Sequence, residues 1–387
     1  MKLRNLTTRI PTAIFPLALG LTACQGDTEP TSAYDWQLPP GFPEPPVPDD
    51  NPMTAEKVAL GRSLFYDVRL SGNQSMSCGS CHLQSKAFSD GKILSTGSTG
   101  DTVHRNAMAL VNVAYNSTYT WPNPLLTTLE DQAMVPMFGE FPVELGMTPY
   151  EAEILNRLAA DEAYPALFSE AFPEDPAPIS TANVVRALAS FERTLISGRS
   201  PYDRYVYQGD KQALSDEALR GMQLFFSETT ECYHCHSGLN FTTAFRTAES
   251  AFTSLDFHNT GLYNLGGTGA YPSDNVGLIE FSGNEADMGK FRVPTLRNVG
   301  LTAPYMHDGS IATLEDVIEH YNVGGRTISE GVNAGVGAEN PYKDPLVRPM
   351  NLSTDEKKAL VAFLQSLTDE AFITDPRLAD PFASSLH

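Results

Sequence analysis

Two short stretches, Cys78-Gly-Ser-Cys81-His82 and Cys232-Tyr-His-Cys235-His236, decide what this chain of 387 residues folds around. Both have the pattern C-x-x-C-H, the attachment signature of c-type haem. Two thiols one helical turn apart can bond the two vinyl groups of the porphyrin, and the next side chain supplies an imidazole to the iron. A redox dithiol, a zinc half-site or a structural disulfide could each explain one pair with an incidental histidine. Two complete copies favour two covalent haem c groups, with His82 and His236 as iron ligands.

The N-terminus has the pattern of an export signal. Three basic residues precede the apolar stretch 13–21. This stretch ends in Leu21-Thr-Ala-Cys24, which resembles a bacterial lipoprotein signal with Cys24 as the lipidated residue. An ordinary secretory signal with an incidental cysteine is the alternative. The sequence thus predicts a signal peptide at 1–23, a Pro-rich tether at 24–50, and a periplasmic protein that a lipid anchors to the membrane.

Composition and charge narrow the class of protein. The chain is long enough for two domains, and no apolar run reaches the eighteen or so residues of a membrane-spanning helix. A formal net charge of −21 argues against nucleic acid as a partner, because phosphate binding needs clustered cations. Helical patterns run through 54–65, 148–168 and 180–196, and a capping box at 353–356 begins a last helix. We therefore expect a mainly α protein, with the Gly- and Asn-rich segment 237–290 as ordered loops.

An internal repeat accompanies the two C-x-x-C-H motifs. A Gly-x-x-Leu-Phe stretch precedes each motif, and Leu-x-Asn-Val and then Thr-Leu-Glu-Asp follow it in the same order. The paired stretches are 61–65 with 221–225, 110–113 with 296–299, and 128–131 with 313–316. Each match is short, but their shared order predicts two related cytochrome c-like domains, at 51–200 and 201–387.

The repeat also bears on the sixth iron ligands. Aligning 128–131 on 313–316 without gaps places Tyr321 opposite Pro136. Tyrosine can bind iron through its oxygen and proline cannot, so this alignment predicts a second haem that is capped and a first haem that is open. The alternative is that Tyr321 is an aromatic residue at a helix end and Pro136 a turn residue. The repeat alone leaves both interpretations open.

From 51 to 367 the chain resembles the bacterial di-haem cytochrome c peroxidase and MauG superfamily. The resemblance rests on the two C-x-x-C-H motifs, on Phe191-Glu-Arg-Thr-Leu-Ile196 and on the stretch from Phe291 to Ser310. Three further stretches look most similar to the MbnH-type di-haem enzymes: 38–43, 50–53 and 95–100. Those enzymes oxidise a tryptophan of a partner protein to kynurenine. The resemblance therefore implies hydrogen peroxide as oxidant and an exported protein as substrate.

The resemblance also implies roles for particular side chains. Trp121 corresponds to the tryptophan that relays electrons between the haems. Tyr321 takes the ligand position at the second iron, where the peroxidases have methionine and MauG has tyrosine. The distal side of the first haem would be formed by Gln132, Pro136 and Glu144, and a calcium site between the haems by Asn106, Thr302 and Pro304. A side-chain oxygen and two backbone carbonyls suit such a hard cation.

Each assignment has a plainer alternative. Trp121 could be a core aromatic, and an isolated Asn or Thr is usually structural. Met306 lies out of register with the ligand position, so we do not assign it to the iron. The other histidines are expected to be solvated or hydrogen bonded: His104, His234, His258, His307 and His320.

These roles predict an enzyme. Peroxide would bind the open iron of the first haem, where Glu144 transfers a proton and Gln132 orients the peroxide. The oxidising equivalents would be shared through Trp121 as a high-valent di-haem state, which phenolate ligation favours more than thioether ligation. This state would oxidise a partner protein, for which a copper-binding protein is one candidate. Two other functions stay open: a scavenger of hydrogen peroxide that takes electrons from a small cytochrome or cupredoxin, and a non-catalytic di-haem electron carrier.

Overall fold

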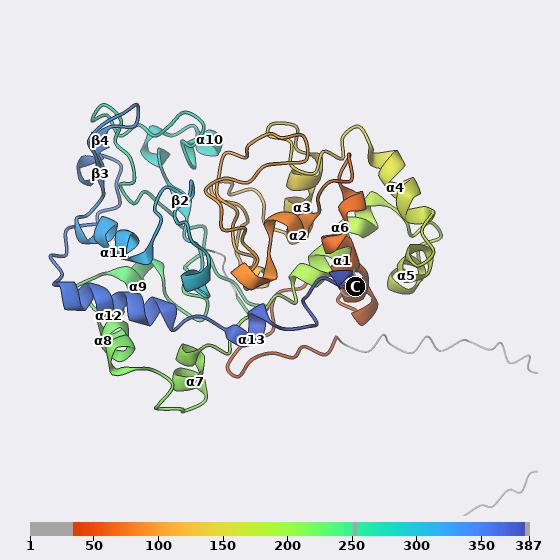
Figure 1. The fold of residues 1–387 in the computed structure, drawn as a ribbon, viewed down its shortest axis with the longest axis horizontal. Coiled ribbons are helices and arrows are strands. Elements are labelled where there is room, and N and C mark those ends of the chain that lie inside the picture. Colours follow the sequence, from red (N-terminus) through yellow and green to blue (C-terminus); the bar gives the residue numbers. More distant parts are fainter. Residues whose placement is uncertain (1–33, 251–253, 384–387) are drawn as a thin grey trace, which may run out of the picture. The chain divides into compact units, whose positions relative to one another are not determined.

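Helices dominate the chain, as the sequence predicts (Figure 1). The computed structural model describes residues 34–250 and 254–383. The predicted signal peptide, the lipid attachment at Cys24 and the first part of the tether lie outside these residues. Within the described parts, none of the helices is both long and apolar enough to cross a membrane.

The elements follow one another as short helices joined by long loops. In chain order the α-helices are α1 (Ala55–Tyr66), α2 (Cys78–Cys81), α3 (Leu129–Phe138), α4 (Glu151–Ala159), α5 (Tyr164–Ala171), α6 (Thr181–Glu192), α7 (Pro201–Tyr207), α8 (Asp216–Phe225), α9 (Cys232–Cys235), α10 (Ile279–Ser282), α11 (Leu314–Asn322), α12 (Thr354–Gln365) and α13 (Glu370–Ile373). Two antiparallel pairs of two-residue strands complete the list: β1 (Phe257–His258) with β2 (Phe291–Arg292), and β3 (Thr327–Ile328) with β4 (Gly335–Val336). The segment 237–290 holds only short elements where it is described, as expected.

One expected helical stretch, 148–168, is instead two helices, α4 and α5. The chain turns at Asp161, whose Oδ1 accepts hydrogen bonds from the backbone N–H groups of Ala163 (2.8 Å) and Tyr164 (3.1 Å). Pro165 then lies in the first turn of α5, where its missing N–H is tolerated. The expectation of one continuous helix is wrong because Asp161 ends one run of backbone hydrogen bonds and Pro165 begins another.

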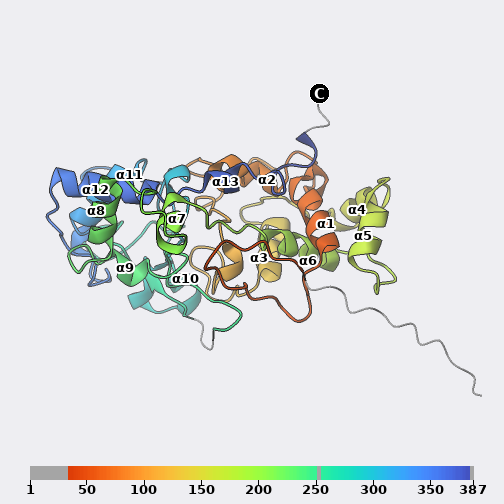
Figure 2. The same cartoon turned by 90° about the horizontal axis from the view of Figure 1, so that it is seen from below.

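Two pairs of helices cross at glycines that occupy equivalent places in the repeat. α1 packs on α6 and α8 packs on α12, toward opposite ends of the chain's body in both views (Figure 1 and Figure 2). A Cβ atom at Gly61 would lie 1.9 Å from the carbonyl oxygen of Ala187, and one at Gly221 would lie 1.8 Å from that of Ala359. No side chain fits such a gap, so glycine is what lets each pair of helix backbones approach this closely.

Each helix pair also packs around three phenylalanines in the same arrangement. One comes from each helix of the pair, and the third follows the C-x-x-C-H motif. They are Phe65, Phe191 and Phe88 in the first core, with ring centroids 5.2 and 6.0 Å from that of Phe65, and Phe225, Phe363 and Phe241 in the second, with centroids 5.1 and 6.1 Å from that of Phe225. These matched contacts support two related domains at 51–200 and 201–387, and that division stays a prediction.

The end of the chain returns to the first core. After α12, the side chains of Phe372 and Leu378 are buried among the residues of the first core. The hydroxyl of Tyr66 on α1 donates a hydrogen bond to the carbonyl of Leu378 (2.7 Å), and Gln84 donates to the carbonyl of Phe372 (3.1 Å). The segment 370–380 therefore completes a core whose other members come from the first half of the sequence.

Candidate haem sites

The two C-x-x-C-H motifs take the same local structure. α2 and α9 are single helical turns that begin and end at the two cysteines of each motif. The histidine comes directly after the turn, and its backbone N–H donates to the carbonyl of the first cysteine, Cys78 (3.0 Å) or Cys232 (2.9 Å). Each turn thus presents two thiols and one imidazole, in the order that attachment of haem c requires.

Both imidazoles are held by a backbone carbonyl. Nδ1 of His82 lies 2.8 Å from the carbonyl oxygen of Phe88, and Nδ1 of His236 lies 3.0 Å from that of Phe241. A ring N–H that donates to a carbonyl leaves Nε2 with a lone pair for a metal. Burial lowers the pKa of both rings, that of His236 to about 4, so both are neutral at physiological pH. This is the state in which an imidazole ligates iron.

A cavity opens beside the second motif. Its walls include Cys232, Cys235, His236 and Tyr321. Tyr321 is at the end of α11, whose first residue is capped by Thr313, just as Thr128 caps α3. Burial raises the pKa of the Tyr321 hydroxyl above its ordinary value, and charge on the nearby cysteine thiols raises it further. The structure therefore brings the predicted tyrosine ligand into the same cavity as the predicted histidine ligand.

The residues predicted to lie between the haems share this cavity. The indole Nε1 of Trp121 donates to the backbone carbonyl of Asn106 (2.9 Å). The side-chain amide of Asn106 donates to the carbonyls of Lys92 (2.7 Å) and Ile93 (3.2 Å), so its Oδ1 points the other way. Thr302 and Pro304 line the same cavity as Asn106. The three residues predicted to bind calcium thus line one cavity, and their role as ligands stays a prediction.

The predicted distal residues of the first haem lie on α3 and the loop after it. Gln132 and Pro136 are one turn apart on α3. The N–H of Leu145 donates to the carbonyl of Pro136 (2.9 Å), and the N–H of Ser98 donates to the carbonyl of Glu144 (2.7 Å). These bonds hold the Glu144 segment between α3 and the loop that contains Ser98.

Two carboxyl groups lie near the first motif. Burial chiefly raises the pKa of the Cys78 thiol, and charge on Glu192 and Glu144 raises it further. Burial also raises the pKa of Glu144 above its ordinary range. Sequence reasoning proposed Glu144 but missed Glu192, although Glu192 stands inside the Phe191–Ile196 stretch that was singled out.

The cavity beside the second motif has further polar wall residues for which the sequence predicted no role in the site. Nδ1 of His258 lies 2.6 Å from a carboxylate oxygen of Asp344, which raises the pKa of His258 to about 10. His307 is buried and stacks on Phe291, with ring centroids 3.6 Å apart. Arg292 is a further wall residue with a buried guanidinium. Each comes from a loop or a two-residue strand, where no periodic pattern marks a side chain as facing a cavity.

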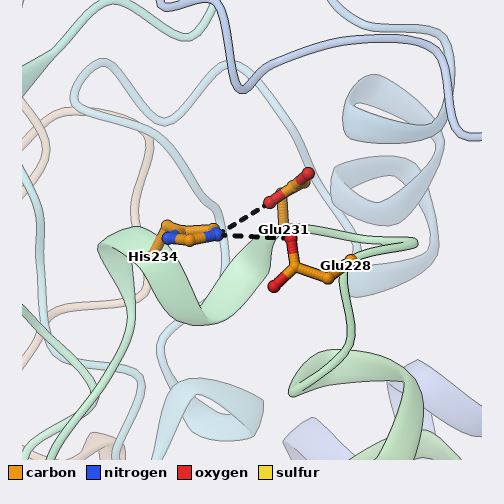
Figure 3. Close-up of side chains that lie close together, drawn as sticks. All are labelled: Glu228, Glu231 and His234. Atoms are coloured by element: carbon orange, nitrogen blue, oxygen red, sulfur yellow. Dashed lines mark ion pairs between the residues drawn. The ribbon is translucent and has the colours of Figure 1, made fainter.

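A cluster of Glu228, Glu231 and His234 lies at the second motif, with the imidazole facing both carboxylates (Figure 3). Nε2 of His234 is 2.8 Å from the carboxylate of Glu231 and 3.9 Å from that of Glu228. Arg348 already pairs with the other oxygen of Glu231 at 2.5 Å. Because a cation of the chain compensates this charge and Glu228 and His234 are exposed, we assign no metal to the cluster.

The paired motifs and the shared cavity define a di-haem c-type oxidoreductase, and comparison with known proteins identifies its family. Residues 55–212 match the model of the family described as di-haem cytochrome c peroxidase. The chain is 35% identical over 343 residues to the methylamine utilization protein MauG of Methylophilus methylotrophus, covering 87% of this chain and 91% of that one. It is 37% identical over 366 residues to the cytochrome-c peroxidase IdrP1 of Denitromonas iodatirespirans, covering 90% and 92%. The chain belongs to the di-haem cytochrome c peroxidase and MauG family, whose members are enzymes.

A solved structure is also similar throughout. The crystal structure of a MauG-like protein associated with microbial copper homeostasis matches with a TM-score of 0.89 and 49% identity, covering 90% of this chain and all of that one. The diheme peroxidase BthA of Burkholderia thailandensis matches with a TM-score of 0.63 and 24% identity, which shows a similar fold. Membership in a di-haem family implies two covalently bound haem c groups, for which the two motifs supply the attachment residues.

Proposed function

We propose that this enzyme uses hydrogen peroxide to oxidise an exported partner protein, with conversion of a tryptophan to kynurenine as its reaction. The donor sets at both motifs fit haem c, since each offers two thiols and a neutral imidazole with Nε2 available. When bound, the haems supply the redox chemistry: for each tryptophan, two molecules of hydrogen peroxide are reduced to water, and the indole C2–C3 bond opens to N-formylkynurenine. Hydrolysis then releases C2 as formate and leaves kynurenine. The observation that carries the proposal is Tyr321, which lines the same cavity as His236.

At the first haem the chain supplies proton transfer and orientation. Pro136 carries no atom that could ligate iron, so beside a bound haem it would leave room for peroxide. Glu144 has a raised pKa, which brings a carboxyl group closer to the neutral range in which proton transfer is efficient. Gln132 lies one turn from Pro136 on the same face of α3, where its amide can hydrogen bond to bound peroxide.

Between the haems the chain would supply a residue for electron transfer and a binding site for calcium. Trp121 is fixed by its hydrogen bond to Asn106 and would carry electrons between the two centres. Calcium would bind Oδ1 of Asn106 and the backbone carbonyls of Thr302 and Pro304, all hard oxygen ligands. Because the same asparagine would hold both Trp121 and the cation, calcium would also fix the position of the indole.

Tyr321 separates this function from peroxide scavenging. A phenolate is a harder and more negative ligand than a thioether, so it favours ferric iron over ferrous iron. An enzyme whose two haems both rest in the ferric state needs no electron from a donor before it reacts with peroxide. A methionine at this position would instead favour a resting enzyme that is half reduced.

The partner and the location complete the proposal. Similarity over 90% of the chain to a MauG-like protein associated with microbial copper homeostasis supports a copper-binding protein as the partner. The predicted export signal and Cys24 favour a periplasmic enzyme on a lipid anchor. Both enzyme and partner would then meet outside the cytoplasm.

The deciding experiment follows the reaction of the fully ferric enzyme with peroxide by stopped-flow spectroscopy. Wild type should react directly, and Tyr321→Phe should lose the spectral change of the second haem while peroxide still binds at the first. Oxidation of the partner should fall by about tenfold or more, since one transition-state interaction of about 1.4 kcal/mol accounts for a factor of ten. Intact mass should show two haems on each variant.

Tyr305→Phe is the matched control. Tyr305 lines the same cavity, and among the described residues its hydroxyl donates only to the backbone carbonyl of Val299 (3.0 Å). The control should react with peroxide as wild type does. If ferric wild type ignores peroxide until one electron is supplied, scavenging is the function and Tyr321 is a packed aromatic at the end of α11.

A further inference from the structure

We propose that Arg292 binds a propionate carboxylate of the haem attached at Cys232 and Cys235, and so fixes the edge of that haem relative to Trp121. The inference rests on haem attachment within the proposed function, but it does not depend on which substrate the enzyme oxidises.

The guanidinium of Arg292 is buried among neutral acceptors. The residue is only 4% exposed. Its Nε donates to the carbonyl of Thr120 (3.0 Å), one Nη to the carbonyl of Val293 (3.5 Å) and the other to Sδ of Met108 (3.4 Å). None of these atoms carries a charge. The contact to Val293 is long and the thioether sulfur is a weak acceptor, and a guanidinium has five N–H donors, so it keeps capacity to donate to a further acceptor.

Carboxylates of the same cavity do not compensate this charge. Two acidic residues line its walls, Asp344 and Glu231. Asp344 pairs with His258 at 2.6 Å, and Glu231 pairs with Arg348 at 2.5 Å. In the part of the chain that the structure describes, Arg292 forms no ion pair within 4 Å.

A buried cation in this situation requires an anion from elsewhere. Burial lowers the pKa of Arg292 to about 10, so the guanidinium keeps its charge at neutral pH. Leaving such a charge unpaired costs several kcal/mol, which a carboxylate partner offsets. Haem c carries two propionates, and the planar guanidinium matches a carboxylate through two parallel hydrogen bonds. Arg292 lines the cavity that contains Cys232, Cys235 and His236, so a haem attached there would bring its propionates into the same cavity.

The backbone of Arg292 contacts the segment of Trp121, the residue proposed to carry electrons between the haems. Its N–H donates to the carbonyl of Trp121 (2.9 Å), while its Nε holds the preceding carbonyl, that of Thr120. One residue therefore fixes the Trp121 segment with its backbone and faces the haem cavity with its side chain. Pairing with a propionate would set the distance between the haem edge and the indole, on which electron transfer between them depends.

The test measures the reduction potential of each haem in holoenzyme variants by spectroelectrochemical titration. Removing a nearby positive charge disfavours the reduced, less positive iron. Arg292→Met should therefore lower the potential of the second haem and make it depend on pH near neutrality, because the propionate gains a proton more easily without its partner. Arg292→Lys keeps the charge and should restore most of the potential. Arg348→Met removes an exposed cation of the same region and should change little, since solvent screens it.

Two results would overturn the inference: an unchanged potential of the second haem in Arg292→Met, or a shift confined to the first haem. Should the variants fail to fold, a crystal structure of the wild-type holoenzyme decides the question. A propionate of the second haem on the guanidinium supports the assignment, and a water molecule or a protein carboxylate in its place refutes it. These measurements involve neither peroxide nor a partner, so they can succeed even if the proposed function fails.

Discussion

Glu192, the last residue of α6, has a buried carboxyl group whose hydrogen-bonding capacity is not fully used. The residue is 7% exposed, and its Oε2 has no hydrogen-bond partner among the described residues. Burial raises its pKa to about 8, with the charge of Arg193 opposing the rise. A buried carboxyl group that cannot find a partner avoids its desolvation penalty by staying protonated.

This leads to a prediction about pH. The unfolded chain ionises Glu192 near pH 4.5 and the folded chain only near pH 8, so between these values the folded state holds one more proton. Stability should therefore fall as pH rises through that window, and the full penalty should be present above it. Glu192→Gln stays neutral at every pH, so it should raise the free energy of unfolding at pH 8 by on the order of 2–4 kcal/mol and change it little at pH 4.

Guanidinium unfolding followed by circular dichroism at several pH values checks this. Glu174→Gln, at an exposed position, is the control and should follow wild type. Parallel pH profiles for wild type and Glu192→Gln would show that Glu192 is ionised in the folded enzyme.

At the scale of single residues, the sequence predicted the haem-attachment residues, because short motifs encode them. The two C-x-x-C-H motifs identify their own cysteines and histidines, because the spacing of one helical turn is local. Arg292 and His258 could not be predicted, because their partners Thr120 and Asp344 are 172 and 86 positions away. Tyr321 and the calcium residues were proposed from an alignment, and their roles stay predictions.

At the scale of elements, the crossing of α1 with α6 depends on the absence of a side chain. The Cβ of Gly61→Ala would lie 1.9 Å from the carbonyl oxygen of Ala187, so the two helices would have to move apart. Alanine is better than glycine in a helix by about 1 kcal/mol, but overpacking of this kind costs about 1–3 kcal/mol or more. We expect Gly61→Ala to lower the free energy of unfolding by roughly 2 kcal/mol, and Gly221→Ala to do the same at the other crossing.

Ser63→Ala on the same helix is the control, because within 34–250 and 254–383 the Ser63 hydroxyl bonds only to the carbonyl of Ala59, also on α1. It should change stability by less than about 0.5 kcal/mol. An alanine at position 61 that stabilises the protein would mean that the helices of the pair are free to separate. Unfolding in guanidinium measures all three variants.

Helices were predicted where caps and periodicity coincide, as at α12, whose capping box joins Ser353 and Glu356. The break between α4 and α5 was missed because the apolar spacing continues through it while Asp161 and Pro165 change the backbone. The long loops have no periodic pattern of apolar residues, so the sequence did not predict their paths.

At the scale of the whole molecule, the first core depends on the last residues of the described chain. Phe372 is 4% exposed and packs its ring 5.6 Å from that of Phe88, whose carbonyl holds His82. Phe372→Ala should cost about 3–5 kcal/mol through the cavity it leaves. It should also disturb the absorption spectrum of the first haem more than that of the second. Phe281→Ala, at a side chain that is 42% exposed, should do neither.

Equal disturbance of both haems by Phe372→Ala would contradict this assignment of the segment to the first core. Thermal unfolding and visible spectra of the ferric enzyme measure both effects. The return of this segment could not be predicted, because contacts such as that of Gln84 with Phe372, 288 positions apart, leave no local pattern in the sequence.

The return of residues 370–380 has a consequence for biogenesis. Under the predicted export from the N-terminus, Cys78 and Cys81 would emerge long before Phe372 and Leu378, so the packing around Phe88 would stay incomplete while translocation continues. During that interval the core beside the first attachment motif would lack the side chains of Phe372 and Leu378. Under that route, the order of residues along the chain would leave this site accessible for haem attachment until the last segment arrives.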